Sequence, residues 1–439
     1  MHTLSELRSS ALRGITRLNL SEGLTELPAE VFELADTLEV LNLSGNALSS
    51  LPDDLPRLHR LKVLFCSDNR FTRVPEVVGQ CPQLSMVGFK SNQIREVSAA
   101  SLPRHLRWLI LTDNQIESLP SELGCRPLLE KVALAGNRLS ALPETMAACQ
   151  QLALLRISAN AFEAFPDWLW TLPKLSWLAL AGNPATQALE AERRRAQTVP
   201  QVAWSDLKVH EVLGQGASGV IHRVDWVQPD GRIQAAALKV FKGALTSDGW
   251  PHSEMGASLS AGQHPHLIGV MGQLKDHPQG LDGLLMPLVD AALQTLAEPP
   301  SLSTCSRDVY PPGRTWALDT AVRMAQESAS ALAHLHARGL MHGDFYGHNL
   351  LWRKGAGLML GDFGAATPYD VSDQLMAERL VRIEVRAWGC FLQELLQHLS
   401  PQDAGRPEVQ ALLALQAQCM GPVLARPTWL EVKEKARQG

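Results

Sequence analysis

A repeated motif in the first half of the chain limits its possible folds more than any other feature. LEVLNLSGNALSSLP, at Leu38, returns as LKVLFCSDNRFTRVP, LSMVGFKSNQIREVS, LRWLILTDNQIESLP, LEKVALAGNRLSALP, LALLRISANAFEAFP and LSWLALAGNPAT. Its asparagines stand 22 or 23 residues apart, at Asn46, Asn69, Asn92, Asn114, Asn137, Asn160 and Asn183. With a weaker first copy at Ile15, eight copies cover about residues 15–187. One copy cannot bury its apolar face alone, so the pattern predicts stacked copies in a solenoid.

The pattern L-x-x-L-x-L-x-x-N-x-L is similar to that of leucine-rich repeats. Alternating apolar positions predict a short strand with one buried face in each copy. The asparagine that follows can satisfy backbone groups where the chain turns. The resemblance implies an α/β solenoid with a curved parallel sheet. The period breaks in residues 184–204, where we expect a cap, so we assign residues 1–199 to this domain.

Several strand positions of the repeats point away from the expected core, toward the concave face of the sheet. They are Phe65, Met86, Lys90, Trp108, Ile110, Lys131, Arg156 and Trp177. Exposed aromatic residues on a rigid surface favour a protein or peptide partner, because aromatic side chains dominate interface hot spots. We select Phe65, Trp108, Ile110 and Trp177 as partner-binding candidates. The alternative is that these side chains pack against the second half of the chain or face water.

Phosphate-binding motifs begin after residue 200. LGQGASGVI, residues 213–221, has the glycine spacing of a nucleotide-binding loop, and strand-like VIHRVDWV overlaps its end. A dinucleotide-binding fold would continue into a helix instead. AAALKVF then places Lys239 on the next predicted strand.

HGDFYGHN, residues 342–349, and the later GDFG complete this series of motifs. They supply Asp344, Asn349 and Asp362 in the order and at the spacing of protein kinases. The resemblance covers about residues 205–435. RPTWLEV and Trp226 are similar to the tyrosine-kinase-like branch, and EVRAWG at Glu384 resembles the start of the large central kinase helix. An α+β two-lobed protein kinase fold is therefore expected for residues 200–439.

The kinase resemblance implies a role for each motif. Asp344 would accept the proton of the acceptor hydroxyl. Lys239 would contact the phosphates, with Glu254 as its ion-pair partner. Asn349 and Asp362 would hold Mg²⁺. Adenine would lie between Val220, Ala237 and the hinge after Met286, with Val289 as donor. The ATP-binding residues would be Leu213, Gly214, Gln215, Gly216, Ala217, Ser218, Gly219, Val220, Ile221, Ala237, Lys239, Met286 and Val289.

The octet departs from the usual kinase pattern at two positions. Gly343 replaces an Arg that normally pairs with a phosphorylated activation loop, so control by loop phosphorylation is not expected. Tyr346 replaces a Lys, and the segment from Asp362 to Glu384 is short. We expect a protein kinase acting on serine or threonine, with the repeats recruiting or sensing a protein. Two alternatives are a small-molecule phosphotransferase, as in aminoglycoside and choline kinases, and a catalytically weak scaffold.

Composition excludes other classes of protein. The net charge of −5 argues against nucleic-acid binding, which needs clustered Lys and Arg; the one basic run, Arg193–Arg195, follows Glu190 and Glu192 and is interpreted as a solvated helix face. No stretch approaches the roughly 18 uncharged apolar residues of a membrane span. Seven scattered cysteines, never in C-x-x-C spacing, indicate a reducing compartment without disulfides or zinc, so a cytoplasmic protein is expected.

Overall fold

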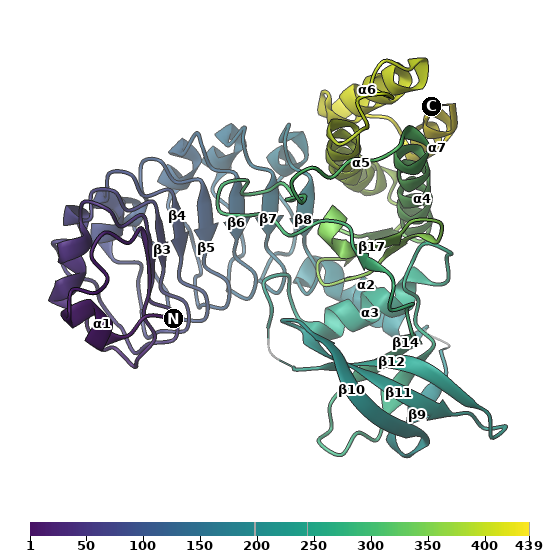
Figure 1. Cartoon of the computed structure of the whole chain (residues 1–439), viewed down its shortest axis with the longest axis horizontal. Coiled ribbons are helices and arrows are strands. Elements are labelled where there is room, and N and C mark those ends of the chain that lie inside the picture. The colour runs from purple at the N-terminus through teal and green to yellow at the C-terminus, as the bar shows by residue number, and fades with distance from the viewer. Residues whose placement is uncertain (197–198, 244, 439) are drawn as a thin grey trace. The chain divides into compact units, whose positions relative to one another are not determined.

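The computed structural model describes residues 1–196, 199–243 and 245–438 (Figure 1). The chain divides into two compact units. The first comprises Met1–Lys174 and Asn183–Ala185, and the second comprises Leu175–Gly182 and Thr186–Gly439. The domain boundary expected near residue 200 therefore falls inside the second unit, which also includes part of the last repeat and most of helix α2 (Pro184–Arg195).

Each repeat forms one three-residue strand, and the strands follow one another in a sheet in chain order. Neighbouring strands pair in parallel, so that Leu41 lies opposite Leu64, and Figure 1 shows β3 to β7 side by side. The expected α/β repeat solenoid is confirmed. The strands are β1 (Arg17–Asn19), β2 (Val40–Asn42), β3 (Val63–Phe65), β4 (Met86–Gly88), β5 (Trp108–Ile110), β6 (Lys131–Ala133), β7 (Leu154–Arg156) and β8 (Trp177–Ala179).

Short 3₁₀ helices return the chain between successive strands. The chain begins with helix α1 (Leu4–Arg8), whose first turn is capped by Thr3. Burying a leucine side chain is worth roughly 1.5–3 kcal/mol, so the repeated buried positions supply much of the stability. The 3₁₀ helices are Ala29–Leu34, Leu55–Arg57, Glu76–Gln80, Ala99–Ser101, Ser121–Cys125, Glu144–Ala148 and Asp167–Thr171. The central strand residues, all buried, are Leu18, Leu41, Leu64, Val87, Leu109, Val132, Leu155 and Leu178.

The recurring asparagines form a ladder through the first unit. The Asn114 amide nitrogen donates to the carbonyls of Phe89 (2.9 Å) and Leu111 (3.0 Å), and its oxygen accepts from the Ile94 N–H (3.0 Å). Each asparagine thus satisfies backbone groups of its own repeat and of the preceding one. This buried hydrogen bonding explains why the sequence places Asn at this position in copy after copy.

The second unit begins with a mixed sheet in the order β10-β11-β12-β14-β13-β9. Its antiparallel part runs from β10 to β13, and β9 adds a parallel strand at the edge. Helix α3 (Pro251–Ala261) packs Met255 and Leu259 against Phe241 and Leu284 of this sheet. The strands are β9 (Gln201–Ala203), β10 (Leu207–Gln215), β11 (Gly219–Val227), β12 (Ile233–Phe241), β13 (Gly272–Lys275) and β14 (Gly283–Pro287).

A helical part follows the sheet in the second unit. Trp388, fully buried on α5, donates from its indole to the hydroxyl of Ser328 on α4 (3.0 Å), which joins the two longest helices. A mixed sheet followed by helices is the expected α+β arrangement. The helices are α4 (Leu318–Ala337), α5 (Gln374–Gln397), α6 (Pro407–Met420) and α7 (Trp429–Gln438). A small three-stranded sheet comprises β15 (Gln294–Thr295), β17 (Leu350–Arg353) and β18 (Gly357–Leu360). A two-stranded sheet comprises β16 (Leu340–Met341) and β19 (Thr367–Pro368). Three further 3₁₀ turns are Trp204–Asp206, Gly347–Asn349 and Val423–Ala425.

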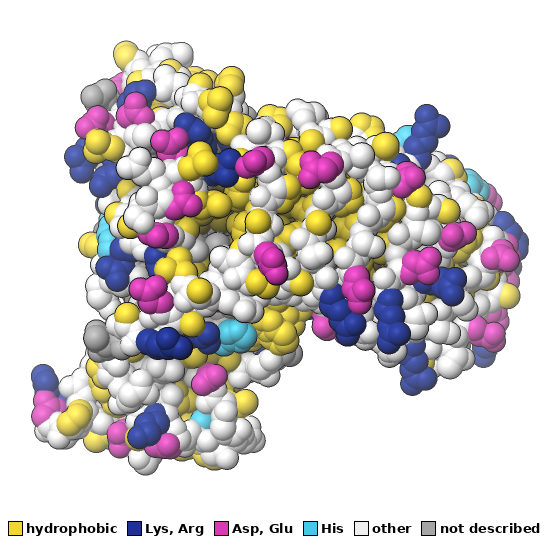
Figure 2. All heavy atoms as spheres, turned by 180° about the vertical axis from the view of Figure 1, so that it is seen from behind, with side chains coloured by type: hydrophobic (Ala, Val, Ile, Leu, Met, Phe, Trp, Pro, Cys, Tyr) yellow, Lys and Arg dark blue, Asp and Glu magenta, His cyan; other side chains and the backbone are white. Residues whose placement is uncertain are grey.

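Figure 2 shows basic and acidic side chains interspersed over the face that it draws. Of the helices that the structure describes, none combines enough length and apolar character to cross a bilayer.

Candidate active site

A cavity of about 930 Å³ in the second unit collects most of the residues expected to bind a nucleotide. Its volume lies at the upper end of the roughly 300–1,000 Å³ of ligand pockets. Gly214, Gln215 and Val220, which the sequence also proposed, do not line it. The expected residues that do are Leu213, Gly216, Ala217, Ser218, Gly219, Ile221, Ala237, Lys239, Met286 and Val289.

The position of Val220 follows from strand geometry. Successive side chains of a strand point to opposite faces, so Ile221 and Val220 cannot both face the cavity. Ile221 is paired with Lys239 across the sheet, and both line the cavity. Of these two expected residues, Ile221 is therefore the one that faces the cavity.

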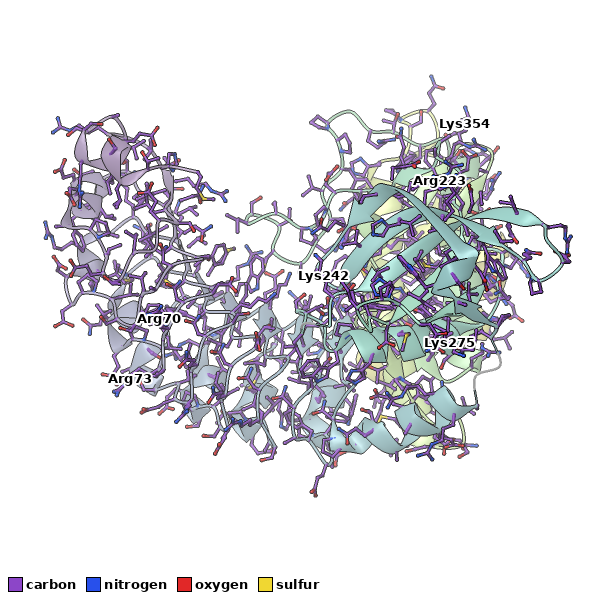
Figure 3. All side chains as sticks on the ribbon, turned by 90° about the horizontal axis from the view of Figure 1, so that it is seen from below. Arg70, Arg73, Arg223, Lys242, Lys275 and Lys354 are labelled. Atoms are coloured by element: carbon purple, nitrogen blue, oxygen red, sulfur yellow. The ribbon has the colours of Figure 1, made fainter. Side chains whose placement is uncertain are left out.

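The glycine loop between β10 and β11 is closed by one backbone hydrogen bond and one hydrogen bond from a lysine side chain. The Gly216 N–H donates to the Gly219 carbonyl (3.0 Å), and the Lys242 ammonium donates to the Gly216 carbonyl (2.9 Å). Lys242 is labelled in Figure 3, together with Arg223 and Lys275 of the same unit and Arg70 and Arg73 of the first. A Cβ on Gly219 would lie 2.6 Å from the Val240 carbonyl oxygen, so this position admits no side chain.

Lys239 and Glu254 form an ion pair between β12 and α3. The Glu254 side chain is only 4% exposed, so it is held almost out of water. Burial raises the pKa of Glu254, and the positive charge of Lys239 opposes that shift. A buried carboxylate needs such a partner, because a buried charge left unpaired is strongly destabilising. The pair fixes the Lys239 ammonium in the wall of the cavity.

The octet forms a loop that brings Asp344 and Asn349 together. The Asn349 amide donates to the Asp344 carboxylate (2.9 Å) and to the Asp344 carbonyl (2.8 Å). Two hydrogen bonds join this loop to Gly361: His342 Nε2 pairs with the Gly361 carbonyl (2.9 Å), and the Gly361 N–H donates to Asn349 O (3.3 Å). The loop is thereby tied to the residue before Asp362.

Asp362 lines the cavity and has an unusual backbone conformation. Its φ of +56° lies in the left-handed region, which costs a residue other than glycine of order 1–3 kcal/mol. The Gly364 N–H donates to its carboxylate (3.2 Å). Such strain is kept where the surroundings impose it, and it is frequent at functional sites.

The donor set fits a hard cation held with phosphate oxygens. Mg²⁺ is usually bound by one or two carboxylates together with substrate phosphates rather than by a dedicated cage. Asp362 faces the cavity, and Asn349 is hydrogen-bonded within the adjoining loop. Across the described part of the chain, no group of three or more His, Cys, Asp or Glu residues forms a metal cluster.

Comparison with known proteins agrees with this geometry. The model of the family "Protein tyrosine and serine/threonine kinase" matches residues 207–396, and that of "Leucine Rich Repeat" matches residues 37–58. The chain joins leucine-rich repeats to a protein kinase domain. The second unit thus has the expected two-lobed kinase fold.

Each of three relatives matches less than half of the chain. The non-receptor tyrosine-protein kinase TNK1 of Homo sapiens is 29% identical over 36% of this chain, and the probable serine/threonine-protein kinase At1g54610 of Arabidopsis thaliana is 34% identical over 23%. The leucine-rich repeat-containing G-protein coupled receptor 5 of Rattus norvegicus is 34% identical over 32%. These matches span 22%, 20% and 15% of the relatives' own lengths.

Glu384 has a role in the kinase domain that the sequence did not reveal. It lies within α5, which begins at Gln374 and not at Glu384. Its carboxylate accepts from the N–H groups of His342 (3.1 Å) and Gly343 (2.7 Å) and pairs with His336 Nε2 (2.7 Å). Burial opposes ionisation, but these hydrogen bonds and the nearby histidines hold the pKa of Glu384 below its usual value. Glu384 anchors the catalytic loop to α5.

A second polar cluster supports the other end of the catalytic loop. One carboxylate oxygen of Asp308 is hydrogen-bonded to His348 Nδ1 (2.6 Å), and the other accepts from the His348 backbone N–H (3.1 Å). Arg307 pairs with Glu394 of α5 (2.7 Å), and burial raises the pKa of Glu394 to about 7. The segment between the hinge and α4 that supplies Asp308 and Arg307 has no recognisable motif, so nothing in the sequence indicated this contact.

The four partner-binding candidates on the repeats differ in accessibility. Phe65, Trp108 and Ile110 are half-buried in the first unit, and the rings of Phe65 and Trp108 meet edge to face, 6.4 Å between centroids. The Lys131 ammonium lies over Trp108, 4.3 Å from the ring centroid. Trp177 belongs to the second unit, is 2% exposed and stacks on Tyr346 of the catalytic loop.

Proposed function

We propose that this chain is an ATP- and Mg²⁺-dependent protein kinase that phosphorylates serine or threonine, with its repeats binding a protein partner. One observation carries the proposal: the cavity brings the glycine loop, the Lys239–Glu254 ion pair and Asp362 to one place. A structural lysine on an unrelated strand would not need a buried carboxylate partner from a separate helix.

The residues of the chain divide the reaction among them. Lys239, Asn349 and Asp362 would hold the phosphates and the metal ion. When bound, ATP supplies the phosphoryl group and Mg²⁺ neutralises its charge. Asp344 accepts the proton of the acceptor hydroxyl, and its hydrogen bond from Asn349 fixes the direction of its carboxylate. Glu254 keeps Lys239 in the cavity wall, so little reorganisation is needed when the nucleotide enters.

The two departures in the octet do not require a small-molecule acceptor. Tyr346 stacks on Trp177, and Gly343 lies against the Leu178 carbonyl, so both are explained by packing inside the second unit. The scaffold alternative is disfavoured because Lys239, Asp344, Asn349 and Asp362 are all present. Serine or threonine is the acceptor that we propose from the sequence. A probable serine/threonine kinase, 34% identical over 118 residues, agrees with this choice, whereas the tyrosine kinase TNK1, 29% identical over 166 residues, does not, so the acceptor panel decides.

An acceptor panel tests the reaction class. The wild-type chain and Asp344→Asn are incubated with labelled ATP, Mg²⁺ and either a protein mixture or small alcohols of the aminoglycoside and choline types. We expect label on protein, recovered as phosphoserine or phosphothreonine and absent with the variant. Label confined to the small molecules would replace the proposal with the small-molecule alternative, and phosphotyrosine would overturn the choice of acceptor.

The proposed partner surface is the group of Phe65, Trp108 and Ile110 on the repeats. A large aromatic residue with a cation over its face is a typical interface anchor. With a protein acceptor identified, Trp108→Ala should raise KM for that protein by about 10-fold or more, since hot-spot truncations cost about 2 kcal/mol or more, and leave kcat unchanged. Leu128→Ala is the matched control, because Leu128 is an exposed apolar residue of the repeats outside this group. Equal KM values for the two variants would refute the assignment.

A further inference from the structure

The end of the repeats contacts the kinase machinery within the second unit. We call residues 175–195, which contain β8 and α2, the junction segment. Residues 175–182 and 186–195 of this segment belong to the same compact unit as the kinase domain. The repeat pattern requires only that β8 bury its leucines, yet this segment also contacts the catalytic loop, the loop after Asp362 and helix α3.

The first contact is with the catalytic loop. The Trp177 indole N–H donates to the Phe345 carbonyl (2.9 Å), and the Trp177 ring stacks on Tyr346 with centroids 4.3 Å apart and planes 5° apart. Phe345 and Tyr346 directly follow Asp344. Trp177 therefore contacts the backbone of Phe345 and the ring of Tyr346, the two residues that follow the catalytic aspartate.

Gly343 provides independent evidence for this docking. Its φ is +74°, and a Cβ there would lie 2.4 Å from the Leu178 carbonyl oxygen and 2.6 Å from the Ala365 carbonyl oxygen. The backbone of β8 thus occupies the space that any side chain at position 343 would need. An arginine at position 343 would clash with the junction segment, so the docking of this segment explains why glycine stands there.

The second contact is with the loop that follows Asp362. The Leu180 N–H donates to the Thr367 hydroxyl (3.1 Å), and the Arg193 guanidinium donates to the Tyr369 carbonyl (2.8 Å). Thr367 is 2% exposed, and the buried Tyr369 hydroxyl donates to the His336 carbonyl (3.0 Å). Both hydroxyls are engaged in packing and are poorly placed to receive phosphate.

The third contact is with helix α3, which carries Glu254. One oxygen of Glu190 accepts from the Ser253 hydroxyl (3.0 Å), and the other accepts from the Thr186 hydroxyl (2.7 Å) and the Gly182 N–H (2.7 Å). Ser253 directly precedes Glu254. Glu190 therefore ties α3 to α2 and to the turn after β8, and α2 and α3 are drawn next to each other in Figure 1.

We propose that the junction segment is a built-in positioning element for phosphoryl transfer, with Trp177 as its main positioning residue. It holds the catalytic loop, the loop after Asp362 and α3 in the arrangement for catalysis, a task that a phosphorylated loop and its arginine perform in other kinases. The contacts support catalysis rather than block it, because the arrangement that they hold has Lys239 paired with Glu254 and Asn349 bonded to Asp344. The effect on rate rests on the kinase function proposed above; the ordering of the loop does not.

The test uses the full chain with Trp177→Ala, Trp177→Phe and a control, Trp316→Ala. Trp316 is a buried tryptophan of the same unit that packs against Trp352 instead of the catalytic loop. Two quantities are measured: the phosphoryl-transfer rate at varied ATP, and amide hydrogen exchange in residues 342–349. The phenylalanine variant keeps a ring against Tyr346 and loses only the hydrogen bond to Phe345.

Trp177→Ala should lower kcat by about 10-fold or more, since a 1 Å displacement of a catalytic group can cost about 100-fold. KM for ATP should stay within about 2-fold, because no junction residue lines the cavity. Exchange in residues 342–349 should become about 10-fold faster as the loop loses its anchor. Trp177→Phe should lie between wild type and alanine, and Trp316→Ala should change neither the rate nor the loop exchange.

Unchanged loop exchange in both Trp177 variants would overturn the proposal, and so would a kcat that rises, because the segment would then block catalysis. If the alanine variant does not fold, the phenylalanine variant decides by the same two measurements. If wild type transfers no phosphate at all, the kinase function fails, and faster loop exchange in the Trp177 variants would still support the positioning role.

Discussion

Replacing Glu384 with Gln changes one buried atom at the base of the catalytic loop. The Glu384 carboxylate, 1% exposed, accepts from the N–H groups of His342 and Gly343 and pairs with His336. A glutamine amide offers one acceptor and one donor, so at least one N–H group faces a donor and stays unsatisfied. A hydrogen bond to a charged group is worth about 1.5–3 kcal/mol, and an unsatisfied buried group costs about 1–3 kcal/mol. Glu384→Gln should therefore lower the free energy of unfolding of the second unit by about 2–5 kcal/mol.

Native-state hydrogen exchange of peptides from α5 measures this loss, because exchange in a core helix reports the unfolding of its own cooperative unit. The matched control is Glu378→Gln in the same helix. Glu378 is 61% exposed and pairs only with Arg382 among the ion pairs of the described residues (3.1 Å). Exposed ion pairs contribute about 0–1 kcal/mol to stability. The control should therefore change the free energy of unfolding obtained from exchange by less than about 1 kcal/mol.

The effect of pH provides a second check on the same residue. The folded-state pKa of Glu384 is depressed, so its contribution is present above the ordinary value of 4.5 and is lost as pH falls through the folded pKa. The difference between wild type and Glu384→Gln should be constant above about pH 6 and shrink in strong acid. A loss no larger than that of the Glu378 control, or a difference that grows in acid, would refute the anchoring role.

Three further predictions concern stability and reactivity. Asn114→Ala should reduce the free energy of unfolding of the repeats by about 2–4 kcal/mol, because it orphans buried backbone groups, whereas the exposed Gln93→Ala should cost less than about 0.5 kcal/mol in the same urea titration. All seven cysteines are free and only Cys125 is exposed, so a chromogenic disulfide reagent should label one thiol in the native chain and none in Cys125→Ser. Burial and the neighbouring histidines lower the pKa of His264 from 6.5 to about 4. Between these pH values the unfolded chain binds a proton at His264 that the folded chain does not, so the free energy of unfolding falls as pH falls from 6.5 to about 4. His264→Asn should therefore flatten the dependence of the urea midpoint on pH between 6.5 and 4, and an unchanged slope would contradict this.

The repeats could be predicted almost completely from the sequence. Their period fixes the strand and the asparagine of each copy, and each copy contacts mainly its neighbours, so local pattern and tertiary structure coincide. The exception is the last repeat, whose residues 175–182 belong to the second unit. Trp177 lies in this segment, although its position in the repeat is equivalent to that of Trp108.

The kinase site was predictable where motifs carry the chemistry. Lys239, Asp344, Asn349 and Asp362 are set by spacing, and the Lys239–Glu254 pair lies where the sequence proposed. Val220 and Ile221 were both proposed as nucleotide-binding residues, and strand alternation, which can be read from the sequence, lets only one of the two face the cavity. The contacts made by Glu384, by Asp308 and by the junction segment could not be inferred from the sequence, because each contact joins residues that are far apart in the chain. Gly343 and Tyr346 were visible as anomalies, but only the structure shows what packs against them.

Phosphoryl transfer with parallel measurement of ATP binding tests the central claim most directly. Asp344→Asn should bind ATP as wild type does and lose transfer to protein by about 100-fold or more, the usual contribution of a general base. Asp362→Asn should lose transfer as well, because the carboxylate proposed to hold Mg²⁺ is lost. A wild-type chain that binds ATP with Mg²⁺ and phosphorylates no protein, or an Asp344→Asn variant that transfers phosphate at the wild-type rate, would contradict the account.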